Sequence, residues 1–99
     1  MQNRDKISKA FHDILENVYY QPPESIEMDY PAIKYRLARI ETNKANNSQY
    51  IIRPGYEVTL IDWDPDSPYV AEILAIPYCS FDRHYAVDGL NHWTFTIYN

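Results

Sequence analysis

Apolar residues in the N-terminal segment recur at the spacing of an amphipathic α-helix. They fall three and four positions apart, which places them on a single stripe: Ile7, Ala10, Phe11, Ile14, Leu15 and Val18. Asn3 suits the N-cap, and Asp5 suits the positive end of the helix dipole. The β-prone residues 18–20 and the following Pro22-Pro23 pair predict that this helix ends near Asn17.

After this helix, much of the chain alternates apolar and polar side chains, the pattern of half-buried strands. Extended segments are expected at Val18–Tyr20, Ala32–Ile40, Tyr56–Asp64, about Tyr78–Val87 and about Asn91–Tyr98. Loops are expected between them. Gln21–Asp29 reads as a loop, Thr42–Gln49 as a flexible polar connection and Arg53–Gly55 as a turn.

A short second helix is predicted after the strand pattern of residues 56–64. Ser67 is the expected N-cap, Pro68 the first helical residue and Pro77 the stop. The expected buried stripe of this helix is Val70, Ile73 and Leu74. The resulting order is α-β-β-β-α-β-β, which predicts one α+β domain whose mainly antiparallel sheet packs against both helices.

The segment FDRHYAVDGLNHWTF predicts a hairpin with two chemically different faces. Asp88-Gly89 favours a two-residue turn, but an odd loop such as 88–90 keeps the apolar residues of both strands together. With that loop, the core face holds Cys79, Phe81, Tyr85, Trp93, Phe95 and Ile97. The opposite, polar face then gathers Asp82, His84, His92, Thr94 and Thr96.

Chemical function has few candidates in this sequence. Asp82, His84 and His92 are a recognised ligand set for a metal ion, but solvated histidines on a strand face are far commoner. Cys79 is expected on the apolar face, where a thiol is usually inert. The acidic group DWDPDS lacks the glycine and the final glutamate of a calcium loop. We therefore expect no enzyme activity, no catalytic or metal-binding residues and no cofactor.

Composition narrows the classes of partner. The 99 residues carry a net charge of −5 with no run of Lys and Arg, which argues against specific nucleic-acid binding. The two glycines exclude a phosphate-cradling loop. An apolar run of about 20 residues, which a membrane span needs, is missing. The first ten residues lack the apolar region of a signal peptide, so we expect folding in the cytoplasm.

Ten tyrosines are too many for so small a core, so some are expected at contact surfaces with other proteins. Tyr19, Tyr20 and Tyr30 are the first group of candidates. The mixed set of Asp82, Arg83, His84 and His92 is the second. From the residues alone, the chain is an acidic α+β domain that works by contacting other proteins.

Three segments together resemble a family of small structural proteins of tailed bacteriophages: VYYQPPESIEMDYPAIKY, DWDPDS and CSFDRHYAVDGLNHWTFTIY. The resemblance is to the tail terminator, or tail completion, family and covers nearly the whole chain. It implies a homo-oligomeric ring, commonly a hexamer, that caps the tail tube and joins it to the head connector. It also implies a place in the virion at the head–tail junction after assembly in the host cytoplasm, with DNA passing through the ring. The family has no catalytic residues to transfer.

Two alternatives remain open at this point. One is a head-completion or stopper protein, which would lie between the portal and the tail. The more remote one is a small metal-dependent enzyme that uses Asp82, His84 and His92.

Overall fold

The computed structural model describes residues 3–44 and 50–98. Its elements are α1 (Asn3–Ile14), β1 (Val18–Tyr20), β2 (Ala32–Lys44), β3 (Tyr50–Asp62), α2 (Tyr69–Leu74), β4 (Cys79–Val87) and β5 (Leu90–Tyr98). This is the predicted order of elements, and the predicted α+β class is confirmed. Neither helix in the described residues has the length and apolar character that a membrane crossing requires.

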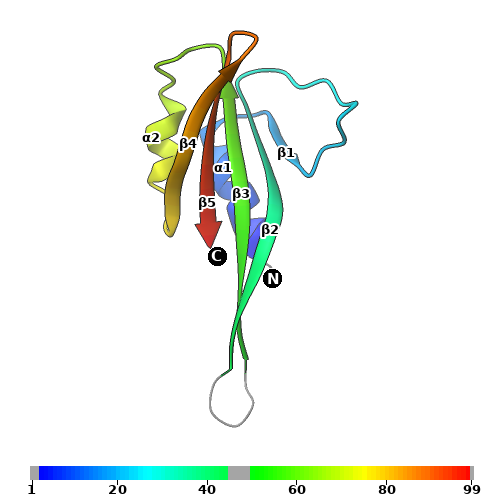
Figure 1. The fold of residues 1–99 in the computed structure, drawn as a ribbon, viewed down its shortest axis with the longest axis vertical. Coiled ribbons are helices and arrows are strands. Elements are labelled where there is room, and N and C mark those ends of the chain that lie inside the picture. Colours follow the sequence, from blue (N-terminus) through cyan, green and yellow to red (C-terminus); the bar gives the residue numbers. More distant parts are fainter. Residues whose placement is uncertain (1–2, 45–49, 99) are drawn as a thin grey trace.

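The five strands form a single mixed sheet in the order β1-β2-β3-β5-β4. Only β1 and β2 run parallel, and the other neighbours are antiparallel. Both helices lie on the same side of the sheet, and the opposite face carries no helix (Figure 1). The sheet therefore has a core face, covered by α1 and α2, and an open face.

The core forms where the predicted stripe of α1 meets the sheet. Ile7 and Phe11 are almost fully buried, and the Phe11 ring meets Tyr35 edge to face with centroids 5.0 Å apart. The helix ends at Ile14, earlier than predicted, because Asn17 instead joins the chain to the start of β2. Its Nδ2 donates to the carbonyl of Pro31 at 3.2 Å.

The β2–β3 hairpin extends far beyond the rest of the sheet (Figure 1). We call residues 40–44 and 50–54 the arm, because they pair with each other past the point where β5 pairing ends at Gly55. The predicted connection over Thr42–Gln49 is wrong for residues 42–44, which belong to β2, and residues 45–49 lie outside the described residues.

The predicted turn at Arg53–Gly55 is also wrong, because these residues are part of β3. Pro54 pairs with Ile40 inside the arm. At this position β3 has no neighbour on its β5 side, and a proline that cannot donate a hydrogen bond is tolerated on such an edge. Pro54 therefore marks a free edge of the strand and not its end, and Gly55 pairs with neighbouring strands on both sides.

Helix α2 is shorter than predicted. It begins at Tyr69, with Pro68 as the capping residue and no side-chain cap, so Ser67 is not the N-cap. The Ser67 hydroxyl still accepts a hydrogen bond from the Tyr69 amide at 3.4 Å. Ile73 is fully buried, but Leu74 is half-exposed, since a helix of six residues turns only a narrow stripe toward the sheet.

The hairpin between β4 and β5 has a two-residue turn, so the predicted odd loop is wrong. Val87 pairs with Leu90, and both turn residues have positive φ angles, 52° at Asp88 and 80° at Gly89. This is the combination that a type I′ turn requires. The apolar pattern is accommodated elsewhere, by a β-bulge between Phe81 and Arg83.

The bulge divides β4 into two halves with opposite registers. Before it, Cys79 and Phe81 pair with core-face residues of β5, as predicted. After it, His84 lies opposite Trp93 on the core face and Tyr85 lies opposite His92 on the open face, both contrary to prediction. One extra residue in a strand is enough to exchange the faces of every later side chain.

Replacement of Gly89 by alanine should destabilise the turn. A Cβ at this position would meet only the Trp63 ring, at 3.7 Å, so the expected cost is conformational and not steric. A positive φ costs an L-residue about 1–2 kcal/mol, and denaturant unfolding should show a loss of that size. Asp88→Asn is the control, because asparagine tolerates positive φ and should leave stability unchanged. Equal losses in both variants would contradict the turn assignment.

Candidate protein-interaction surface

The open face is built from three rows of side chains that cross the sheet. Its middle row runs from Lys34 on β2 through Thr59 and Thr94 to Arg83 on β4. Each neighbouring row follows the same strand order. The neighbouring row on the side away from the arm contains Ile61, His92 and Tyr85. The neighbouring row on the side toward the arm contains Arg36, Glu57 and Thr96.

A groove of about 430 Å³ lies on this face, beneath the loop that joins β1 to β2. Thr59 and Thr94 lie among its lining residues on the two central strands, and both are largely buried. Lys34 and Arg83 lie on either side of them. The overhanging loop contributes an apolar wall: Pro22, Pro23, Ile26 and Met28. The groove thus combines an apolar side with cations at both margins of a hydroxyl-lined floor. Two carboxylates, those of Glu24 and Glu57, also line it.

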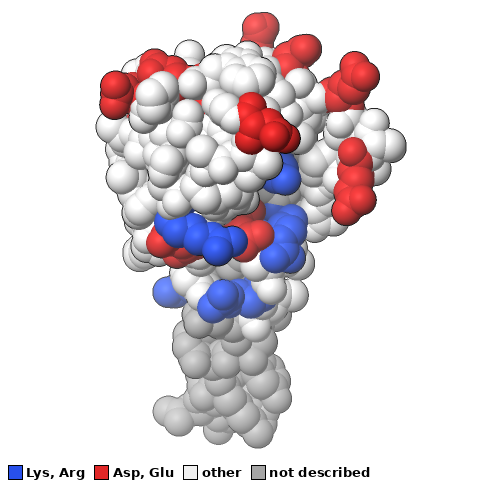
Figure 2. Space-filling view, turned by 45° about the horizontal axis from the view of Figure 1, so that its top comes forward, with Lys and Arg blue, Asp and Glu red and all other residues white. Residues whose placement is uncertain are grey.

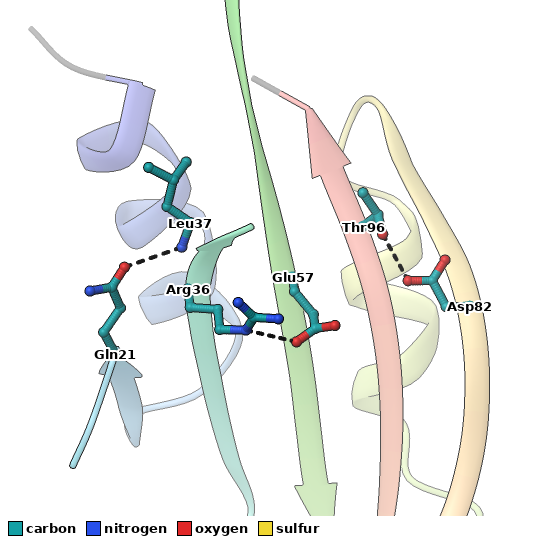
Figure 3. Close-up of polar contacts among 6 residues, drawn as sticks. All are labelled: Gln21, Arg36, Leu37, Glu57, Asp82 and Thr96. Carbon is teal, nitrogen blue, oxygen red and sulfur yellow. Dashed lines mark hydrogen bonds and ion pairs between the residues drawn. The ribbon is translucent and has the colours of Figure 1, made fainter. Parts of the chain in front are cut away.

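Polar contacts on this side of the sheet tie neighbouring strands together (Figure 3). Arg36 Nε donates to Glu57 Oε1 at 2.9 Å, between β2 and β3. Thr96 Oγ1 donates to Asp82 Oδ2 at 2.7 Å, between β5 and β4. Asp82 therefore lies on the open face, as predicted, and its carboxylate is already used within the chain.

The two histidines of the hairpin lie on opposite faces of the sheet. His84 Nε2 is 2.9 Å from Asn91 Oδ1, and its ring packs on Trp93. His92 instead stacks on Tyr85 with ring centroids 4.8 Å apart. The proposed ligand set of Asp82, His84 and His92 is thus split by the bulge. Within residues 3–44 and 50–98, no three His, Cys, Asp or Glu side chains are grouped to hold a metal ion.

Burial lowers the pKa of His92 below its ordinary value, while the hydrogen bond to the Leu90 carbonyl opposes this change. The ring is therefore neutral at neutral pH. In that state, Nδ1 carries the proton that it donates to the carbonyl, at 3.2 Å. His92 thus presents a neutral aromatic ring to Tyr85 and adds no charge to the open face at neutral pH.

The Cys79 thiol should be slow to react. Burial, with a smaller contribution from Asp82, raises its pKa to about 11 from an ordinary value of 9.0. The thiolate is the reactive form, so alkylation by iodoacetamide near neutral pH should be roughly 100-fold slower in the folded chain than in denaturant. Mass spectrometry of timed samples would measure the two rates. Equal rates in the folded and denatured chain would show that the Cys79 thiol is not protected by burial.

The predicted interface residues do not form one patch. The Tyr19 hydroxyl accepts a hydrogen bond from the Asp29 amide at 3.3 Å, and Tyr20 packs on Tyr35 at the core. Tyr30 meets Trp63 edge to face, at the end of the sheet away from the arm. In the second predicted group, Asp82, Arg83 and His92 lie together on the open face, whereas His84 lies on the core face.

The sequence pattern missed a cluster of positive charge on the open face. Five of the nine Lys and Arg residues belong to it: Lys34, Arg36, Arg39, Arg53 and Arg83. Arg39 belongs to this cluster because it pairs with Gly55, on the open face of the sheet. The side chains of Arg39 and Tyr98 both occupy the space that a side chain at position 55 would fill. The alternation along β2 alone predicts that Lys34 and Arg36 share a face. That Arg83 lies on the same face can be predicted only when the order of the strands is known.

No protein-family model matches this chain, and no curated protein matches its sequence. The open face combines cations, hydroxyl groups, aromatic rings and the carboxylates of Glu57 and Asp82 around the groove. Such a surface suits carboxylates and aromatic side chains of another protein.

Proposed function

We propose that this protein is a structural subunit of a tailed bacteriophage virion, a tail terminator that assembles with copies of itself into a ring. In this role, the ring caps the tail tube and joins it to the head connector. The support from sequence is the resemblance of residues 18–35, 62–67 and 79–98 to the tail terminator family. The support from geometry is the arm.

The arm carries this proposal because it is built for contact with another molecule. A two-stranded ribbon is marginally stable alone and needs a further strand or a packing surface. At the base of the arm, Ile40 is 57% exposed and Arg39 and Arg53 are also exposed. No helix covers this part of the hairpin in Figure 1. Packing against a neighbouring subunit or a tail protein would supply the missing surface.

Mass measurement of the purified protein, alone and mixed with tail tubes, tests this proposal. The expected result is a ring, formed either in solution or on the end of the tube. Electron microscopy of the neck should then place the protein at the junction. A strict monomer that never binds tails or connectors would overturn the proposal.

Phage assembled without this protein would distinguish the terminator from the stopper. Loss of a terminator should leave tails of incorrect length or tails that are unattached to heads. Loss of a stopper should leave leaking heads beside normal tails. The first outcome is the one that we expect.

A further inference from the structure

Charge is unevenly distributed along the molecule (Figure 2). The end opposite the arm is acidic, and a band of Lys and Arg, with some carboxylates among them, lies between this end and the arm. We define the acidic end by the exposed carboxylates of Glu27, Asp29, Asp64, Asp66 and Asp88. The segments that carry them, residues 24–31, 62–68 and 87–90, contain no Lys or Arg. We define the cationic face by the five Lys and Arg residues of the open face.

Two members of the cationic face can offer their charge to an outside partner, although the Arg83 guanidinium also lies over the Tyr85 ring, 5.1 Å from its centroid. Arg36 is paired with Glu57, but Lys34 and Arg83 form no ion pair with any described residue. They lie three strands apart, a distance of roughly 14 Å at the backbone. The groove floor of Thr59 and Thr94 lies between them. This spacing can receive two carboxylates from one incoming segment.

The acidic end presents carboxylates beside a protruding aromatic ring. Trp63 is 58% exposed, although its ring touches Tyr30 and lies near Gly89. It does not line the groove of its own chain. An exposed tryptophan among like charges suits an anchor residue, because tryptophan is enriched at the centres of interfaces. The apolar wall of the groove offers it a complementary surface.

Single-stranded nucleic acid is the less favoured occupant of the cationic face. Base stacking needs free aromatic rings, but Tyr85 is stacked on His92 and lies within 5.1 Å of the Arg83 guanidinium. The exposed Tyr78 ring also has a cation near it, the guanidinium of Arg53 at 5.9 Å. The acidic end would in addition repel a long polyanion.

We propose that the cationic face of one copy binds the acidic end of a second copy. The contact joins two different patches, so it is heterologous and can propagate around a closed ring. Trp63 of one copy packs on the apolar wall of the groove, and neighbouring carboxylates reach Lys34 and Arg83. This inference rests on the self-assembly in the proposed function, but not on its phage setting.

Charge reversal at the two patches tests the contact. The face-reversed variant carries Lys34→Glu and Arg83→Glu. The end-reversed variant carries Asp29→Lys and Asp66→Lys, whose side chains have no hydrogen bond or ion pair with described residues. By sedimentation velocity at low ionic strength, each variant alone should self-associate at least about tenfold more weakly than the wild type. An equimolar mixture should recover association, because both contacts between unlike variants are attractive.

Two matched controls change net charge equally at other places. Lys6→Glu with Lys9→Glu matches the face-reversed variant, and Glu16→Lys with Glu72→Lys matches the end-reversed variant. Both controls should associate like the wild type. Added salt should dissociate the wild-type complex, since exposed charges are screened beyond about 10 Å at 0.1 M salt. Circular dichroism of each variant would verify that it is folded.

Several outcomes would overturn the inference. They are a wild-type monomer at low salt, association that survives both reversals, and failure of folded variants to recover on mixing. Binding of a single-stranded oligonucleotide that displaces the second copy would assign the face to nucleic acid instead. Ring formation that survives both reversals would leave the proposed function standing. Recovery on mixing, by a protein that never binds tails or connectors, would overturn only the proposed function.

Discussion

Replacement of Phe11 by alanine is expected to lower the free energy of unfolding by about 3–5 kcal/mol. The Phe11 ring is fully buried and joins α1 to the sheet through its edge-to-face contact with Tyr35. Its removal takes away apolar contacts and leaves a cavity between two layers that cannot fully collapse. Small domains have a total stability of about 5–15 kcal/mol, so this single change removes a large share of it. Urea or guanidinium unfolding followed by circular dichroism measures the loss.

Phe81→Ala is the matched control for this prediction. Phe81 lies on the core face of the sheet, against which Phe11 packs, but the residue is 46% exposed on the edge strand β4. Its truncation should cost about 1 kcal/mol, mainly through the contact with Phe95. If Phe11→Ala does not fold, Phe11→Leu keeps most of the volume and should lose less than about 1.5 kcal/mol. Equal losses at positions 11 and 81 would contradict the assigned core.

Asn91→Ala should cost about 2–3 kcal/mol, the second largest effect that we expect. The buried Asn91 amide contacts His84 at 2.9 Å and donates to the carbonyls of Trp63 and Asp62 at 3.3 and 3.5 Å. It thus links β4, β5 and the segment that follows β3. Each net hydrogen bond contributes about 1 kcal/mol, and a buried partner left unsatisfied costs more. Thermal or denaturant unfolding would detect the loss.

Thr96→Ala provides the comparison for Asn91. Its hydroxyl also bridges β5 and β4, through Asp82, but this contact is exposed to water. Water can replace the lost partner there, so the expected change is below about 1 kcal/mol. A loss at Thr96 as large as the loss at Asn91 would show that burial does not decide the value of these contacts.

The sequence predicted those parts of the fold that depend on local periodicity. The stripe of Ile7 and Phe11, the alternation from Ala32 and the order of the elements are all confirmed. Proline and glycine led to wrong predictions where their effect on a strand depends on the neighbouring strands. Pro54 and Gly55 resemble a turn in sequence, yet both lie within β3. Pro54 is tolerated there because β3 has no β5 neighbour at this position, whereas Gly55 pairs with Arg39 and Tyr98.

The candidate surface was less predictable because it depends on strand order and on one irregular residue. In a continuous β4 strand, alternation would require the extra residue to lie in the hairpin loop. The structure keeps the short turn at Asp88 and Gly89 and inserts the extra residue near Asp82. His84 and Tyr85 exchanged faces as a result. The cationic face was missed because Lys34 and Arg83 are far apart in sequence, and only the pairing of β2 and β4 with the central strands β3 and β5 puts them in the same row.

The bulge in β4 also bears on how the edge of the sheet behaves toward other chains. At nine residues, β4 is the longer of the two edge strands of the sheet, and an unbroken edge of that length can template the strand of another chain. The bulge interrupts the regular row of amide and carbonyl groups, and Asp82 and Arg83 put opposite charges beside the break. Such an edge resists indiscriminate strand pairing and amyloid-like aggregation. The extra residue that made the register prediction wrong therefore also makes this edge a poorer template for another strand.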